Sequence, residues 1–104
     1  MNRKLRRLGK AVIDLVHIKT FMTVATTKNF GRAAAILGYS QSSVTNHIKM
    51  LERELGAQLF DRFRFARKIM LTDVGRSTLD YSQRLLALAE ETKAAAQKAS
   101  SKSA

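Results

Sequence analysis

The sequence contains no cysteine, no proline and no tryptophan. Without cysteine the chain can form no disulfide, no thiolate metal site and no cysteine nucleophile. The two histidines, His17 and His47, lie thirty residues apart and lack the spacing of metal ligands, so neither a metal site nor a cofactor is predicted. Without proline, long helices joined by short connections are favoured.

Acidic residues and long apolar runs are also scarce. Nineteen Lys and Arg stand against eight Asp and Glu, which gives a formal charge of +11 and a pI near 10.8. A polyanion is therefore the expected partner. No apolar run approaches the roughly 20 residues that a membrane span requires, so a soluble, cytoplasmic protein is expected. An enzyme is disfavoured, because no acid, base and nucleophile share a recognisable setting.

Residues 32–60 have the internal spacing of a helix-turn-helix. Ala34 is small enough for two helices to cross closely, and Gly38 permits the left-handed backbone of a tight turn. Ser40 can cap a helix over 41–55, which Gly56 can end. Steps of four and three predict one buried face on that helix: Val44, Ile48, Leu51 and Leu55. The opposite face is polar: Ser42, Asn46, Lys49 and Arg53.

Two shorter helices, a wing and a long last helix are predicted around this motif. The periodicity indicates helices over 14–27 and 31–37, with Phe30 packing at the entrance of the second. Phe63 and Phe65 alternate with arginines, and Ile69 and Leu71 repeat at an interval of two, which suggests a short two-stranded wing within 58–71. Thr72 can cap the last helix, with Asp73 in its first turn. The predicted organisation is a basic extension over 1–13, a winged helix-turn-helix over 14–72, a linker and dimerisation helix over 73–99, and a polar, disordered tail over 100–104.

The last helix carries a stripe with coiled-coil spacing: Thr78, Tyr81, Leu85, Leu88, Thr92, Ala95 and Ala99. Its first two turns are expected to pack on the chain's own domain. A helix of some twenty-five residues projects beyond so small a domain, and its far end needs another apolar surface. A homodimer through this helix is therefore predicted, with an interface made by Tyr81, Leu85, Leu88, Thr92 and Ala95.

A set of short motifs runs in register from about Leu15 to about Ala96. It comprises AA at 33 and 34, SQ at 40 and 41, LE at 51 and 52, LG at 55 and 56, LF at 59 and 60, and LT at 71 and 72, together with Leu37, Val44, Ile48, Arg62 and Gly75. The set resembles the N-terminal DNA-binding domain of LysR-type transcriptional regulators. The resemblance implies a mainly α-helical winged helix-turn-helix that binds double-stranded DNA, and linker helices that pair in a dimer.

Candidate DNA contacts lie on several segments. Gln41 and Ser42 can meet a phosphate or a base edge, or can simply cap their helix. Asn46 could pair with adenine and Thr45 could touch a thymine methyl, although any exposed helix face is polar. A basic cluster at 62–68 suits phosphates and the minor groove, although a run of charges can also be merely solvated. The predicted set is Arg32, Ser40, Gln41, Ser42, Ser43, Thr45, Asn46, Lys49, Arg53, Arg62, Arg64, Arg67 and Lys68.

Other side chains are given structural interpretations. His47 is interpreted as a helix-surface residue rather than a proton switch, and Phe63 and Phe65 as packing residues rather than base-stacking platforms. The leader MNRKLRRLGKAVI has five basic residues and no acidic one, and could be a DNA-contacting arm or a solvated leader.

The sequence departs from the LysR pattern in three places. Ser42 replaces a frequent proline. The wing is about two residues longer than usual and has no glycine at its tip. The family's large C-terminal effector-binding domain is missing from these 104 residues, so no small-molecule effector site is expected in this chain.

The favoured hypothesis is therefore sequence-specific binding of duplex DNA by a dimer, at an inverted repeat, to regulate transcription on the nucleoid. The alternatives are a sequence-indifferent architectural DNA-binding protein and an oligomerisation module whose charge is incidental.

Overall fold

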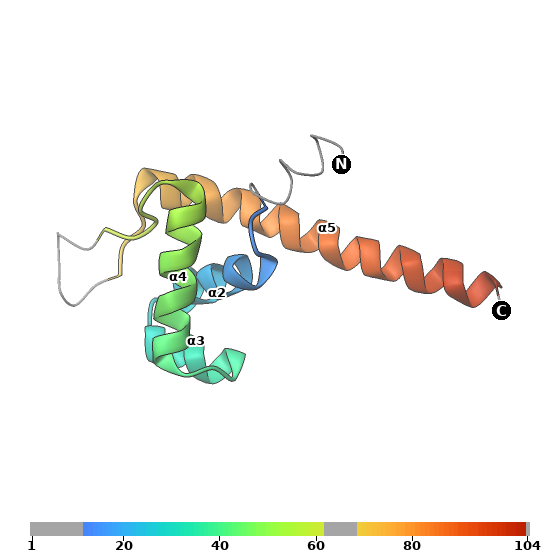
Figure 1. Cartoon of the computed structure of the whole chain (residues 1–104), viewed down its shortest axis with the longest axis horizontal. Helices are drawn as coiled ribbons and strands as arrows, with labels where there is room; N and C mark the ends of the chain where they lie inside the picture. The colour runs from blue at the N-terminus through green and yellow to red at the C-terminus, as the bar shows by residue number, and fades with distance from the viewer. Residues whose placement is uncertain (1–11, 62–68, 104) are drawn as a thin grey trace, which may run out of the picture.

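The computed structural model describes residues 12–61 and 69–103, which contain four helices. These are α2 (Leu15–Thr27), α3 (Phe30–Leu37), α4 (Gln41–Leu55) and α5 (Asp73–Ser103). The first three form a compact group at one end of α5, and the second half of α5 extends away from them (Figure 1). The mainly helical architecture predicted from the sequence is confirmed. None of these helices combines the length and the apolar character needed to cross a bilayer.

Each helix begins at a side-chain cap that accepts a hydrogen bond from the first turn. The backbone N–H groups of Val16, Arg32, Ser43 and Gly75 donate to the side chains of Asp14, Asn29, Ser40 and Thr72 at 2.8, 2.9, 3.1 and 2.9 Å. Such caps satisfy donors that have no partner within the helix. The predicted roles of Ser40 and Thr72 are confirmed. The cap at Asn29 explains why α3 begins at Phe30, one residue earlier than predicted.

Three helices end in a left-handed residue. Gly38 and Gly56, at φ +73° and +71°, close α3 and α4 as predicted. Lys28, at φ +55°, closes α2, and its N–H donates to the carbonyl of Val24 at 2.8 Å. Left-handed backbone is unfavourable for a residue with a Cβ, so the sequence alone offered no signal for this turn.

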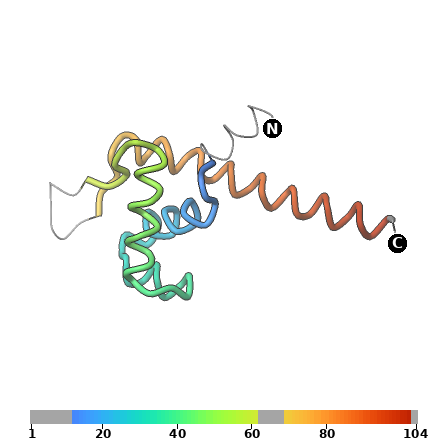
Figure 2. The backbone as a smooth tube through the Cα atoms, viewed as in Figure 1, coloured from blue at the N-terminus to red at the C-terminus, as the bar shows by residue number. Residues whose placement is uncertain are grey.

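The core lies where α2 contacts the other three helices (Figure 2). Ile18, Phe21 and Val24 of α2 are fully buried, as are the predicted α4 residues Val44, Ile48 and Leu51. Leu55 is partly buried against them. Ala33 and Ala34 of α3 are also buried in this core, where their small side chains suit close packing between helices.

The segments at the base of the predicted wing run side by side in opposite directions. Phe60 and Leu71 form an isolated antiparallel bridge. The N–H of Asp61 donates to the carbonyl of Met70 at 2.7 Å, and the N–H of Thr72 to that of Leu59 at 3.0 Å. No strand occurs in the described parts of the chain, and residues 62–68, including Phe63 and Phe65, lie outside them. The two-stranded wing is therefore not confirmed.

The end of α5 differs from the prediction. The helix continues to Ser103, whereas 100–104 was expected to be a disordered tail. The segment contains neither glycine nor proline, and an existing helix extends without a new nucleation step. Its polar composition correctly signals exposure, because residues 90–102 are all exposed, but exposure does not exclude a helix.

The face of α5 that packs on the domain is also not the predicted stripe. Leu79 and Leu86 are partly buried and Ser82 is fully buried, whereas Tyr81 and Leu85 are 58% and 40% exposed. At the start of the helix, a Cβ on Gly75 would lie 2.1 Å from the carbonyl oxygen of Leu59. Only glycine permits this approach, which attaches α5 to the segment after α4.

Candidate nucleic-acid interface

The two faces of α4 differ sharply in exposure. Val44, Ile48 and Leu51 have no exposed surface and fix the helix on the core. Thr45 is half-buried, and the other predicted contact residues on this side are exposed: Gln41, Ser42, Asn46, Lys49 and Arg53. The helix therefore presents a mixed row of uncharged hydrogen-bonding groups and cations on a rigid support.

The hydroxyl groups at the start of α4 are partly engaged with one another. The Ser40 oxygen accepts from the N–H of Ser43, and the Ser40 and Ser43 oxygens lie 2.9 Å apart. The Ser42 oxygen is 3.1 Å from that of Ser40. Ser40 and Ser43 thus serve the cap first, while Gln41 and Ser42 remain at the surface. A Cβ on Gly31 would be 3.4 Å from Oε1 of Gln41, which places this amide over the first turn of α3.

Two shallow hollows follow the exposed side of α4. One is lined by Gln41, Ser42, Thr45, Asn46 and Lys49. The next is lined by Lys49, Glu52, Arg53, Gly56, Ala57 and Gln58. Lys49 lines both, and we call the two hollows together the trough. Its lining includes Gly56 and Gln58, which were not predicted as contacts.

The charges around this trough are mainly positive. Lys49 and Arg53 are exposed, and Arg32 is exposed on the neighbouring α3. Glu52 is partly buried, and its carboxylate accepts from the N–H of Leu59 at 2.8 Å. The remaining predicted cations, Arg62, Arg64, Arg67 and Lys68, lie outside the described residues.

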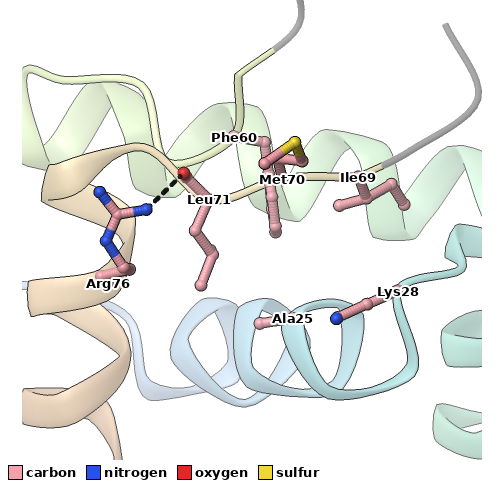
Figure 3. A pocket seen from close by; sticks show the side chains of 7 residues that line it. All are labelled: Ala25, Lys28, Phe60, Ile69, Met70, Leu71 and Arg76. Carbon is pink, nitrogen blue, oxygen red and sulfur yellow. Dashed lines mark hydrogen bonds between the residues drawn. The ribbon is translucent and has the colours of Figure 1, made fainter. Parts of the chain in front are cut away.

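A further hollow lies between α2 and the base of the predicted wing (Figure 3). Its lining is Ala25, Lys28, Phe60, Ile69, Met70, Leu71 and Arg76. Arg76 donates from Nη1 to the carbonyl oxygen of Leu71 at 3.2 Å and also pairs with Asp73. Arg76 therefore connects the start of α5 to the segment that leads out of the basic cluster.

His17 of α2 and His47 of α4 lie side by side, although their spacing in the sequence gives no sign of a contact. Their ring centroids are 5.1 Å apart. Nδ1 of His17 lies 3.0 Å from a carboxylate oxygen of Glu54, and Nδ1 of His47 lies 2.9 Å from the hydroxyl of Thr20. His47 is half-buried in this contact, so its interpretation as a helix-surface residue is wrong. In residues 12–61 and 69–103, no three His, Asp or Glu side chains could hold a metal ion.

The predicted dimer residues form an exposed row on α5. Tyr81, Leu85 and Leu88 are 58%, 40% and 60% exposed, and Thr92 and Ala95 continue the row toward the projecting end. The guanidinium of Arg84 lies 5.0 Å from the centre of the Tyr81 ring and 3.4 Å from a carboxylate oxygen of Asp80. In the part of the chain that the structure describes, the apolar side chains of this row are only partly covered.

The sequence model for bacterial regulatory helix-turn-helix proteins of the LysR family matches residues 15–76. The chain belongs to the LysR family. The matched region contains all of α2, α3 and α4 and the first turn of α5, so it includes the whole trough. The remainder of α5 lies beyond the match.

Its LysR-family relatives are named as transcriptional regulators. The uncharacterized HTH-type transcriptional regulator YwqM of Bacillus subtilis is 42% identical over 83 residues, which are 80% of this chain and 28% of YwqM. CitR of the same organism is 46% identical over 74 residues, which are 71% of this chain and 25% of CitR. The chain thus spans about a quarter of the length of these relatives.

Solved LysR-family structures share the fold. The DNA-binding domain of CbnR, in complex with DNA, aligns with a TM-score of 0.78 and 32% identity over 85% of this chain and 99% of that chain. Vibrio fischeri DarR, also in complex with DNA, aligns with a TM-score of 0.80 and 26% identity over 86% of this chain and 30% of that chain. The arrangement of α2 to α5 is therefore that of a LysR DNA-binding domain.

Proposed function

We propose that this chain binds double-stranded DNA sequence-specifically, as a homodimer, and regulates transcription. The observation that carries the proposal is the exposed side of α4, where Gln41, Ser42 and Asn46 present uncharged hydrogen-bonding groups beside Lys49 and Arg53. The DNA complexes of CbnR and DarR support it, because each contains a domain of this fold.

The α4 helix lies in the major groove in this proposal. The groove of B-DNA is about 12 Å wide and admits one α-helix, and its base edges differ in their donors and acceptors. Asn46 can form two hydrogen bonds to adenine, and Gln41 and Ser42 can reach base edges or phosphates from the first turn. The buried face of α4 fixes the helix on the core and so sets the backbone positions of these residues, which base readout requires.

The cations supply affinity that does not depend on sequence. Arg32 on α3 is placed to meet the phosphate backbone, because the first helix of a helix-turn-helix crosses that backbone. The basic residues Arg62, Arg64, Arg67 and Lys68 are proposed to contact phosphates or the minor groove. In the sequence they lie between Phe60 and Leu71, which form an antiparallel bridge.

The exposed row on α5 is the homodimer interface, and its chemistry favours antiparallel helices. Bulky residues occupy its first half and small residues its second half. In an antiparallel pair Leu85 faces Leu88 of the partner, and Tyr81 faces the small Thr92, whereas a parallel pair would place each Tyr81 on its copy. The same register brings Arg84 against Glu91 of the partner, twice by symmetry.

The antiparallel register sets the distance between the two DNA-binding domains of the dimer. The two-fold axis lies between Leu85 and Leu88, about 13 residues from the start of α5. At 1.5 Å per residue, each domain attaches about 20 Å from the axis, and the two attachment points are about 40 Å apart. One turn of B-DNA is about 34–36 Å, so a dimer of these dimensions suits an inverted repeat with half-sites in successive major grooves. The proposed partners are thus the DNA of the nucleoid, in the cytoplasm, and a second copy of the chain.

A second candidate function is favoured by the charge of +11, which would also suit a sequence-indifferent architectural protein. Selection of bound sites from a random duplex pool separates the two. We expect one inverted repeat to be enriched; recovery of the input pool unchanged would contradict sequence-specific binding. We also expect log affinity to fall with log salt at a slope of roughly -5, if about six phosphates are neutralised. A slope near zero would contradict both candidates.

A further inference from the structure

A polar contact between α2 and α4 is not explained by core packing. Thr20 has no exposed surface, and its hydroxyl oxygen lies 3.0 Å from the carbonyl oxygen of Val16 and 2.9 Å from Nδ1 of His47. His47 follows Asn46 directly in the sequence and is half-buried on α4. The contact thus joins the helix that carries the candidate base-reading residues to the centre of the domain.

The hydrogen atoms in this contact can be assigned. A threonine hydroxyl has one hydrogen to donate, and a carbonyl oxygen can only accept. The contact to Val16 therefore uses the hydrogen of Thr20. With that hydrogen given to Val16, we assign a hydrogen to Nδ1 of His47, which donates it to the Thr20 oxygen.

His47 also connects the two ends of α4. The ring of Tyr39, which precedes the Ser40 cap, meets the His47 ring edge-on with centroids 5.1 Å apart. The His47 ring also contacts the ring of His17, which is hydrogen-bonded to Glu54 near the end of α4. His47 therefore touches the turn before α4 and the helix beneath it, and through His17 it is coupled to the last turn.

We propose that His47 is a positioning residue for base readout. Its Nδ1–H bond to Thr20 and its ring contacts set the rotation and depth of α4, so that Asn46 and Gln41 meet the base edges. This role rests on the proposed sequence-specific function. Readout needs side chains held within about 0.5 Å of their productive positions, whereas attraction between cations and phosphates tolerates larger displacements.

Three substitutions test this role. His47→Leu removes the Nδ1–H donor and keeps an apolar side chain, whereas His47→Asn places an amide N–H near the position of Nδ1. Thr20→Val removes the acceptor with little change of shape. We expect His47→Leu and Thr20→Val each to weaken binding to the selected duplex about 3- to 10-fold, the range set by one net hydrogen bond, and to change binding to random duplex less than about twofold. His47→Asn should restore selected-site affinity to within about twofold of the original protein.

The two single substitutions should not be additive. If they remove the same bond, the double variant Thr20→Val, His47→Leu should bind no more weakly than either single variant. Circular dichroism should show that every variant keeps its helix content at the temperature of the titrations. Equal losses on selected and random duplex, equal losses for His47→Leu and His47→Asn, or additive losses in the double variant would each overturn the positioning role.

Nitrogen-15 spectra of the imidazole in the unbound full chain give an independent readout. We expect the neutral ring of His47 to carry its hydrogen on Nδ1; a hydrogen on Nε2 instead would overturn the assignment. An original protein that binds all duplexes equally would overturn the role in readout. If that protein binds all duplexes equally while its spectra show hydrogen on Nδ1, the Thr20–His47 bond is present. The proposed sequence-specific function is then the part that is wrong.

Discussion

Replacing Leu85 and Leu88 together by glutamate should separate the dimer into folded monomers. In one chain these side chains are 40% and 60% exposed, which together amounts to about one fully exposed leucine per protomer and two per dimer. Burying a leucine completely contributes about 1.5–3 kcal/mol, so the four side chains contribute about 3–6 kcal/mol to association. That free energy corresponds to a factor of roughly 10² to 10⁴ in the dimer dissociation constant. Glutamate adds like charges at the interface, so the loss should be at least this large.

Sedimentation equilibrium measures this constant directly. A matched control is Met50→Glu, because Met50 is 37% exposed, close to the exposure of Leu85, but lies on α4 and not on α5. The control should keep the dimer mass, while the double variant should sediment as a monomer with unchanged helix content. The double variant should also lose affinity for the paired half-sites, because each monomer then binds alone. A dimer constant unchanged by the double substitution would refute the α5 interface.

The remaining predictions concern the orientation of the pair and the attachment of α5. Arg84→Glu alone should weaken the dimer, and adding Glu91→Arg should restore it, because the exchanged charges again face each other across antiparallel helices; sedimentation that shows no restoration would contradict this register. Gly75→Ala should lower the free energy of unfolding by about 1–3 kcal/mol or more, because its Cβ would lie 2.1 Å from the Leu59 carbonyl oxygen. Urea unfolding measures this loss, and stability equal to that of the original protein would show that α5 can move aside freely.

Much of the helical fold could be predicted because its signals are local. The bounds of α4 follow from Ser40 at one end and Gly56 at the other, and the structure confirms both caps. The buried face of the same helix follows from apolar residues that recur every three or four positions between these two caps. A cap or a periodic stripe depends on residues within a few positions, so tertiary structure is not needed to recognise it.

The missed features depend on contacts between distant parts of the chain. The inner stripe of α5 was hidden because one of its buried positions is Ser82, whose hydroxyl is satisfied by the carbonyl of Thr78 at 2.6 Å. The contact of His17 with His47 joins residues on two helices, and no sequence spacing reports it. The close approach of Gly75 to Leu59 is of the same kind: the family motif contained this glycine, but only the fold explains why a side chain is excluded there.

Some features of the candidate DNA interface could be predicted from the sequence, and others could not. The exposed position of Gln41, Ser42 and Asn46 follows from helical periodicity, and the structure agrees. Hydrogen bonding among the Ser40, Ser42 and Ser43 hydroxyls, and the trough that extends to Gln58, required coordinates. Whether these side chains contact DNA stays a prediction.

The central claim is that α4 reads base sequence, and paired titrations test it most directly. Asn46→Ala and Gln41→Ala remove uncharged groups, whereas Arg32→Ala removes an exposed cation assigned to the phosphate backbone. Each variant is titrated with the selected duplex and with random duplex at one salt concentration. We expect Asn46→Ala and Gln41→Ala each to cost about 1–3 kcal/mol on the selected duplex and little on random duplex, and Arg32→Ala to weaken both alike. If the ratio of the two affinities stayed unchanged in both Asn46→Ala and Gln41→Ala, α4 would not be the element that reads the DNA.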